Sequence, residues 1–111
     1  MPETQGLGMN LLEIIQDIHA MDEELHKYET KYGLRSQYFY ELYKTGQLRD
    51  EDPVEVRDYT DWAACYEIKR HREQLYDAIV RNVLKQIKAQ RPISLEELTK
   101  VLKSAKVPAG V

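Results

Sequence analysis

The first candidates for chemistry in this sequence are two histidines and an acid on one helical face. His19, Glu23 and His26 are spaced by four and three positions, so they share a face of a helix. Glu23 and His26 form one Glu-x-x-His pair, and di-iron helical bundles use two such pairs. Glu67 and His71 are spaced by four positions, not three, so they do not supply the second pair. We therefore predict a solvated face here, with no metal and no cofactor.

A second candidate is a group of aromatic residues that is followed by a basic run at Lys69–Arg72. Aromatic rings beside bases can stack nucleobases. However, the net charge is -3 and the isoelectric point is about 5.6, which argue against a nucleic-acid binder. The rings also recur at helical spacing, so the pattern favours an aromatic core. The group consists of Tyr28, Tyr32, Tyr38, Phe39, Tyr40, Tyr43, Tyr59, Trp62 and Tyr66.

A third candidate is the basic side of the segment after the aromatic residues, formed by Arg81, Lys85 and Lys88. These side chains could contact phosphate or an acidic partner protein, although the pattern favours a solvated face. No set of nucleophile, base and orienting residue emerges, and Cys65 lies in an apolar stretch. The sequence therefore predicts a protein that is not an enzyme.

Length and composition predict a small helical protein. The chain has 111 residues and a mass of 13.1 kDa, which corresponds to one domain with a thin core. Hydrophobic residues make up 42% and charged residues 32%. The single cysteine fits a reducing compartment, and we find neither a signal peptide nor a membrane span. We expect a cytoplasmic protein that does not bind membranes.

The first long helix is predicted over residues 10–32, after an arm at residues 1–9 that we expect to be disordered. Asn10 and Glu13 have the spacing of a capping box, and Gly33 can end the helix in the left-handed conformation. Its apolar positions alternate steps of three and four, the pattern of a helix that packs lengthwise on another. This seam contains Leu11, Ile14, Ile18, Met21, Leu25, Tyr28 and Tyr32.

A short helix is predicted over residues 36–45, with Ser36 as its cap and Gly46 as its stop, and a long one over residues 53–90. Asp52 and Pro53 form the start of the long helix, and Pro92 forces its end. Its pairing seam contains Trp62, Tyr66, Tyr76, Val80, Val83 and Ile87. Cys65, Ile68, Leu75, Ile79 and Leu84 widen this seam. A polar interruption at Lys69–Glu73 predicts a bend or a change of partner.

A fourth helix is predicted over residues 94–105, before a tail at residues 106–111. Ser94 and Glu97 have the spacing of a second capping box. Leu95, Leu98, Val101 and Leu102 lie on one side of this helix, which could dock in the groove of a partner or fold back onto the bundle. The whole pattern predicts an all-α protein. We expect an antiparallel helical hairpin or small bundle with one long helix, within one domain at residues 10–105 and open to completion by dimerisation.

The middle of the chain resembles a group of small helical prokaryotic proteins, several of which are encoded beside small toxins. The resemblance rests on Lys31-Tyr32-Gly33-Leu34-x-Ser36-x-x-Phe39-Tyr40-x-x-Tyr43-x-x-Gly46-x-Leu48-x-Asp50 and on Asp61-Trp62-Ala63-Ala64-x-Tyr66-Glu67. It implies an antitoxin-like role, in which the protein covers the surface of a toxin, often a nuclease. Many antitoxins also carry a helix-turn-helix or ribbon DNA-binding domain, and this sequence shows neither.

These observations leave two main functional hypotheses and a weaker third. The first is a protein-binding module, antitoxin-like, with a cognate toxin as its partner. Its contact residues would be Leu95, Leu98, Val101 and Leu102, with Arg81, Lys85 and Lys88 beside them. The second is a homodimeric helical scaffold. The third is a nucleic-acid binder that uses the basic face of the long helix.

Overall fold

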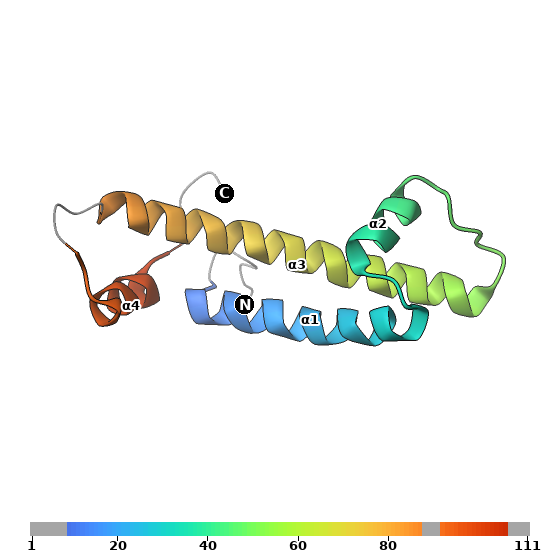
Figure 1. Cartoon of the computed structure of the whole chain (residues 1–111), viewed down its shortest axis with the longest axis horizontal. Coiled ribbons are helices and arrows are strands. Elements are labelled where there is room, and N and C mark those ends of the chain that lie inside the picture. The colour runs from blue at the N-terminus through green and yellow to red at the C-terminus, as the bar shows by residue number, and fades with distance from the viewer. Residues whose placement is uncertain (1–8, 88–91, 107–111) are drawn as a thin grey trace, which may run out of the picture. The chain divides into compact units, whose positions relative to one another are not determined.

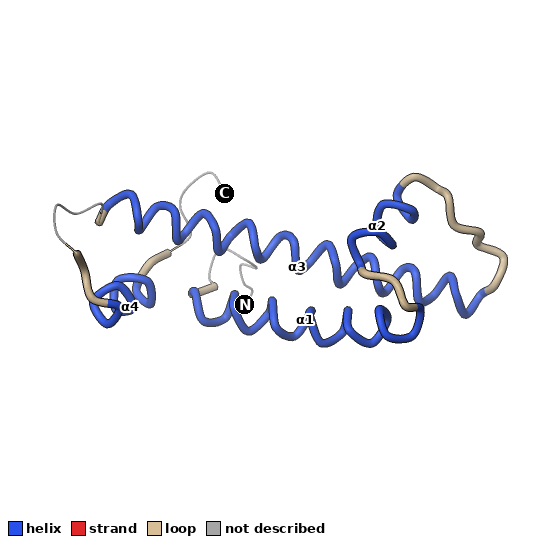
Figure 2. The backbone as a smooth tube through the Cα atoms, in the orientation of Figure 1, coloured by secondary structure: helices blue, strands red, loops and turns tan. Residues whose placement is uncertain are grey.

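The computed structural model describes residues 9–87 and 92–106, and in this part of the chain all regular structure is helical. The helices are α1 (Leu11–Tyr32), α2 (Ser36–Lys44), α3 (Pro53–Gln86) and α4 (Leu95–Ser104), as Figures 1 and 2 show. The predicted all-α class with one long helix is therefore confirmed. The predicted arm and tail lie outside the described residues, apart from Met9 and Lys106.

Local capping signals place most helix ends where the sequence predicts them. The Asn10 side chain accepts from the Glu13 amide at 2.9 Å, and Glu13 accepts from the Asn10 amide at 3.0 Å. Ser94 and Glu97 form the same reciprocal pair at the start of α4. The Asp52 carboxylate accepts from the Val54 amide at the start of α3.

Two glycines end helices in the conformation that favours glycine, because Gly33 has φ +70° and Gly46 has φ +72°. The end of α3 differs from the prediction. The helix ends at Gln86 and Ile87 lies in a turn, whereas the predicted end at Gln90 lies outside the described residues.

Ser36 does not cap α2, so that part of the prediction is wrong. The residue in the cap position is Arg35, which makes no side-chain capping bond, and Ser36 is the first residue of the helix. The Ser36 amide, which a cap would normally satisfy, instead donates to the Glu29 carboxylate at 2.8 Å. Glu29 lies in the last turn of α1. Its carboxylate therefore accepts the hydrogen bond that an N-cap side chain of α2 would otherwise accept.

The chain forms two compact units, and each contains parts of α1 and α3. Unit 1 comprises residues 1–17 and 72–111, and unit 2 comprises residues 18–71. In unit 1 the described buried residues come from both helices: Leu11, Ile14, Leu75, Ile79 and Val83. In unit 2 the core consists of Leu25, Phe39, Trp62 and Ala63. Within each unit α1 and α3 belong to the same chain and lie side by side (Figure 1), so this pairing needs no second chain.

The buried side of α3 in unit 1 is turned slightly from the predicted seam. Tyr76 and Val80 are half-buried, whereas Leu75 and Ile79 are fully buried together with Val83. The three buried residues follow steps of four, and such a row drifts by about 40° per step around a helix. The predicted seam alternates steps of four and three, which keeps it on one side of the helix without this drift. Leu84 and Ile68, which we expected at the edge of the seam, are exposed.

The polar interruption in α3 does not break the helix, which is continuous from Pro53 to Gln86. Two of its basic side chains pair with acids of α1 instead. In unit 2, Lys69 lies 2.7 Å from Asp22, and in unit 1, Arg72 lies 2.8 Å from Asp17. The boundary between the two units falls at residues 71 and 72. The interruption therefore marks the place where one apolar core gives way to the other.

Candidate functional site

The apolar side of α4 contains Leu95, the most exposed of the large hydrophobic residues that the structure describes. We call this side the α4 surface, and it consists of Ile93, Leu95, Leu98, Val101 and Leu102. Leu95 is 75% exposed and Ile93 is 37% exposed. The other three are half-buried, and α4 has no buried residue. A ten-residue helix with apolar residues on one side is thus only partly covered.

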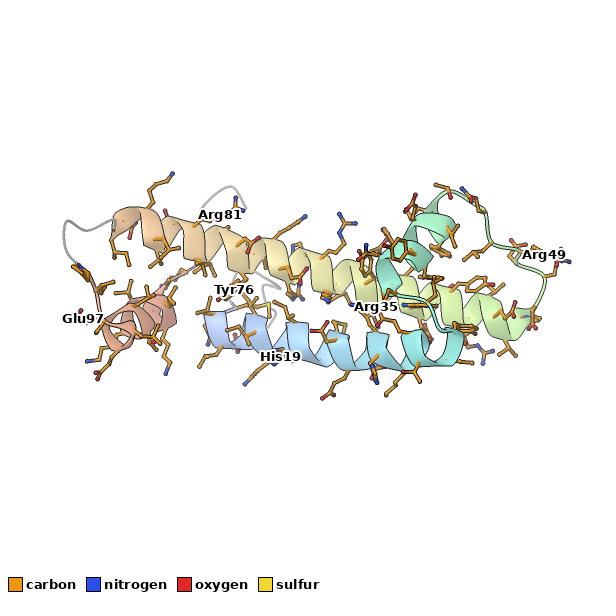
Figure 3. All side chains as sticks on the ribbon, in the orientation of Figure 1. His19, Arg35, Arg49, Tyr76, Arg81 and Glu97 are labelled. Carbon is orange, nitrogen blue, oxygen red and sulfur yellow. The ribbon has the colours of Figure 1, made fainter. Side chains whose placement is uncertain are left out.

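The charged residues around α4 include both signs. Glu96 and Glu97 occupy its first turn, and Lys103 occupies its last, an arrangement that complements the helix dipole. Arg81 and Lys85, which the sequence suggested as partner contacts, are exposed near the end of α3. Figure 3 marks the places of Arg81 and Glu97. Lys88 lies outside the described residues. The two ends of α4 therefore carry charges of opposite sign that could contribute specificity beside its apolar side.

The aromatic group forms the core of unit 2, as the spacing favoured. The Trp62 and Phe39 rings stack with centroids 3.9 Å apart and an interplanar angle of 1°. Tyr28 and Tyr32 stack against Trp62, each with centroids 5.6 Å apart. The exception is Tyr38, whose side chain is 55% exposed. Most of these rings are therefore packed in the protein and are not available for stacking with nucleobases.

A polar node inside unit 2 links α1, α2 and α3. The Trp62 indole donates to the Ser36 hydroxyl at 2.8 Å, and that hydroxyl donates to the Glu29 carboxylate at 2.6 Å. Arg35 pairs with Glu29 at 3.2 Å. Every polar group in this chain of bonds has a partner, which a buried network requires. The node fixes α2 against both long helices, and sequence reasoning missed it because its members lie far apart in the chain.

Two carboxyl groups of unit 2 have lowered pKa values. Burial by itself would raise the pKa of Glu29, but hydrogen bonds from Ser36 and the charge of Arg35 outweigh it, so the pKa is lowered. The hydrogen bond from Lys31, followed by that from Tyr32, lowers the pKa of Asp58. These bonds measure 2.7 Å and 2.5 Å. Both groups are therefore held in their charged form.

We expect unit 2 to lose stability in acid because of these two groups. Folding lowers both pKa values, so the folded state binds fewer protons than the unfolded state. The stabilisation is complete above the ordinary carboxyl range, near about pH 4, and is lost as the pH falls through the folded values. Thermal unfolding across this range checks the prediction. The Glu29→Gln and Asp58→Asn variants should show a flatter acid dependence than Glu23→Gln, a change at an exposed position, and equal slopes would contradict the assignment.

A group of side chains on the surface of unit 2 combines tyrosine rings with cations. We call it the tyrosine–arginine cluster, and it consists of Tyr40, Lys44, Tyr66, Glu67 and Arg70. The Arg70 guanidinium lies 5.9 Å from the Tyr40 ring centre and 5.8 Å from that of Tyr66. The Tyr40 hydroxyl donates to Glu67 at 2.6 Å. These contacts join α2 to α3 and engage the rings with the protein's own cations.

The remaining candidates for chemistry are placed as follows. His19, Glu23 and His26 are exposed, and Figure 3 marks His19 on α1. Among the described residues no group of three or more histidine, cysteine or acidic side chains could hold a metal ion. Burial, followed by the nearby carboxylates of Glu24 and Asp61, raises the pKa of the Cys65 thiol. A raised pKa disfavours the reactive thiolate.

An open hollow of about 350 Å³ lies at the loop before α3, lined by Arg49, Glu51, Asp52 and Glu55. Its polar groups already have structural partners. Arg49 pairs with Glu51 at 2.8 Å, and Asp52 caps α3. Figure 3 marks Arg49 in this loop. We therefore interpret the hollow as part of the start of α3.

Comparison with protein-family models, with curated proteins and with solved structures found no significant match. In the part of the chain that the structure describes, no helix is long and apolar enough to cross a lipid bilayer. Most of the residues that carry the resemblance to small toxin-associated proteins have structural roles in unit 2. Phe39, Trp62 and Ala63 are buried, Ser36 belongs to the polar node, and Gly33 and Gly46 end helices.

Proposed function

We propose that this protein is a non-enzymatic, cytoplasmic protein-binding module, and that it acts as an antitoxin-like inhibitor that covers the surface of a small toxin. The observation that carries the proposal is the α4 surface, where Leu95 is 75% exposed on a helix that buries none of its residues. The resemblance of residues 31–50 and 61–67 to small toxin-associated proteins supports the same conclusion. The two lines of support are separate, because the resemblance lies in unit 2 and α4 lies in unit 1.

The α4 surface has the layout of a helix that docks in a groove. Leu95, Leu98 and Leu102 are spaced by three and four, the spacing by which such helices place their anchors in an apolar groove. A large side chain that is left in water gains roughly 1.5–3 kcal/mol when a partner buries it fully. The exposed fraction of Leu95 therefore makes it the residue that gains most from a partner.

The capping box prepares α4 for binding. Ser94 and Glu97 satisfy each other's backbone amides at 3.0 Å and 3.2 Å, which favours the helical state before any partner arrives. A helix that is already formed pays less ordering entropy on binding. Inhibition would then follow from coverage of the toxin's surface.

The experiment is co-expression with the small toxin gene that we expect beside the gene for this protein. The wild-type chain should relieve the toxin's growth arrest. Leu95→Asp should abolish relief, because it puts a charge at the most exposed apolar residue of the α4 surface. The substitution keeps the helix intact, since an acid is favourable in the first turn. Lys100→Asp, which introduces the same side chain at an exposed polar position, should still relieve the arrest.

Two results would reject the proposal. One is persistent growth arrest with the wild-type chain at full expression. The other is equal relief by the wild-type chain and by Leu95→Asp, which would mean that α4 is not the contact. Circular dichroism of the purified variants is the control for folding, and both should retain the helical content of the wild-type chain.

A further inference from the structure

The outer side of α3 in unit 2 carries an exposed row of residues that is separate from the α4 surface. We call it the outer stripe, and it consists of Val54, Arg57, Asp61, Ala64 and Ile68. The steps are three, four, three and four, so these residues follow one side of the helix, and all five are exposed. Val54 is 62% exposed and Ile68 is 39% exposed.

The outer stripe faces away from the core of unit 2. At 100° per residue it lies on the side of α3 opposite to Tyr59 and well away from Trp62 and Ala63. Tyr59 packs against the core cluster, and the other two belong to it. Asp61 lies close enough to α1 for its charge to contribute, after burial, to the raised pKa of Tyr28. All five side chains of the stripe are nevertheless exposed, which leaves this side of α3 accessible to another molecule.

The order of residues in the outer stripe is symmetric about Asp61. Val54 lies seven positions before Asp61, and Ile68 lies seven positions after it, which is one heptad in each direction. If two copies of α3 pair antiparallel about a two-fold axis at Asp61, Val54 of one copy meets Ile68 of the other. The same contact occurs again on the other side of the axis, as a closed two-fold interface requires.

The charges of the outer stripe also complement one another in this arrangement. Arg57 lies four positions before Asp61, so it faces the second copy one turn, or roughly 6 Å, from that copy's Asp61. An arginine side chain can span this distance. The two Asp61 carboxylates near the axis would each receive one Arg57 guanidinium, which offsets their mutual repulsion.

Arg57 and Asp61 are available for such contacts. Among the described residues neither forms an ion pair within the chain. They are four positions apart in the order base then acid, which is the weaker orientation for a pair within one helix. A second copy can therefore satisfy both charges better than the single chain does.

We propose that two copies of this chain form a two-fold symmetric dimer in which the outer stripes pack antiparallel. We choose a second copy as the partner because the stripe is complementary to itself. Its apolar ends meet each other, and its central base and acid meet the acid and base of the other copy. From Val54 to Ile68 the helix rises by roughly 21 Å, so the interface is short. We expect a weak dimer of the class with small interfaces. None of its residues belongs to the α4 surface, so the inference does not depend on the proposed function.

Charge reversal provides a sharp test, with sedimentation equilibrium of the purified full chain as the measurement. Arg57→Asp creates four acids at the axis, and Asp61→Arg creates four bases. Each should weaken dimerisation by at least about tenfold, because like charges that meet in an interface are costly. The double variant, Arg57→Asp with Asp61→Arg, exchanges the charges and should restore wild-type dimerisation within about threefold.

A mixture of the two single variants adds a second arm. Arg57→Asp supplies only acids and Asp61→Arg supplies only bases, so the mixed pair should associate more strongly than either variant alone. The positions are exposed, and the unfolding midpoint of each dilute variant should stay close to that of the wild-type chain. A wild-type chain that is monomeric at all concentrations, or a double variant as dissociated as the single ones, would overturn the proposal.

A disulfide experiment locates the axis directly. In a Cys65→Ser background, Asp61→Cys gives each copy a single thiol at the two-fold axis. The thiols of the two copies then lie next to each other. Mild oxidation should convert this variant to a covalent dimer much faster than Lys27→Cys, at an exposed position of α1. Equal rates for the two variants would contradict the antiparallel arrangement even if the chain is dimeric.

Discussion

Replacing Trp62 with alanine is expected to lower the free energy of unfolding by about 3–5 kcal/mol, the range for the loss of a large buried aromatic side chain. Trp62 is only 1% exposed, and its ring stacks on Phe39, Tyr28 and Tyr32. The substitution leaves a large cavity among these rings. It also removes the indole donor to Ser36, which joins α3 to the polar node. Both changes weaken the aromatic core of unit 2.

Urea unfolding followed by circular dichroism is the measurement, because Trp62 is the only tryptophan and fluorescence would be lost with it. Tyr38→Ala is the matched control, since Tyr38 belongs to the same group of aromatic residues but is 55% exposed. It should change the unfolding free energy by no more than about 0.5 kcal/mol. If the two variants lose similar stability, the aromatic core is not the main source of stability in unit 2.

The second large effect is expected in unit 1, where Ile79→Ala should lower the free energy of unfolding by about 2–5 kcal/mol. Ile79 is fully buried, and Leu75 and Val83 are buried one turn before and after it on α3. Leu84→Ala, at a position that is 46% exposed on the same helix, is the control and should have a much smaller effect. The pairing seam predicted from the sequence contains Val80 and places Ile79 among the residues that widen it. That seam would predict a larger loss of stability for Val80→Ala than for Ile79→Ala.

Val80→Ala distinguishes the two expectations. Val80 is half-buried, so its truncation should cost less than that of Ile79. Chemical denaturation of the three variants decides between them. A larger loss for Val80→Ala than for Ile79→Ala would show that the buried side of α3 follows the predicted seam.

Helix positions and most helix ends could be predicted from the sequence because their causes are local. Asn10 and Glu13, Ser94 and Glu97, and the two glycines act within a few residues of themselves. Ser36 shows the limit of such reasoning. It resembles a cap in the sequence, but the Glu29 carboxylate of α1 accepts from both the amide and the hydroxyl of Ser36. The same hydroxyl accepts from the Trp62 indole.

The candidate site was less accessible to sequence reasoning than the fold. Periodicity shows that α4 has an apolar side, but it does not show how much of that side the rest of the chain covers. The three-dimensional structure supplies this information, with Leu95 largely exposed and Leu98, Val101 and Leu102 half-buried. The symmetry of the outer stripe was visible in the sequence, yet its importance depends on the exposure of Val54 and Ile68.

We propose α4 as the contact for a protein partner. Amide hydrogen exchange of the purified chain, with and without the product of the neighbouring toxin gene, tests it most directly. We predict new protection concentrated in residues 93–104 and lost in the Leu95→Asp variant. Protection that appears only in unit 2, or none at all under conditions where the two proteins form a complex, would contradict the claim.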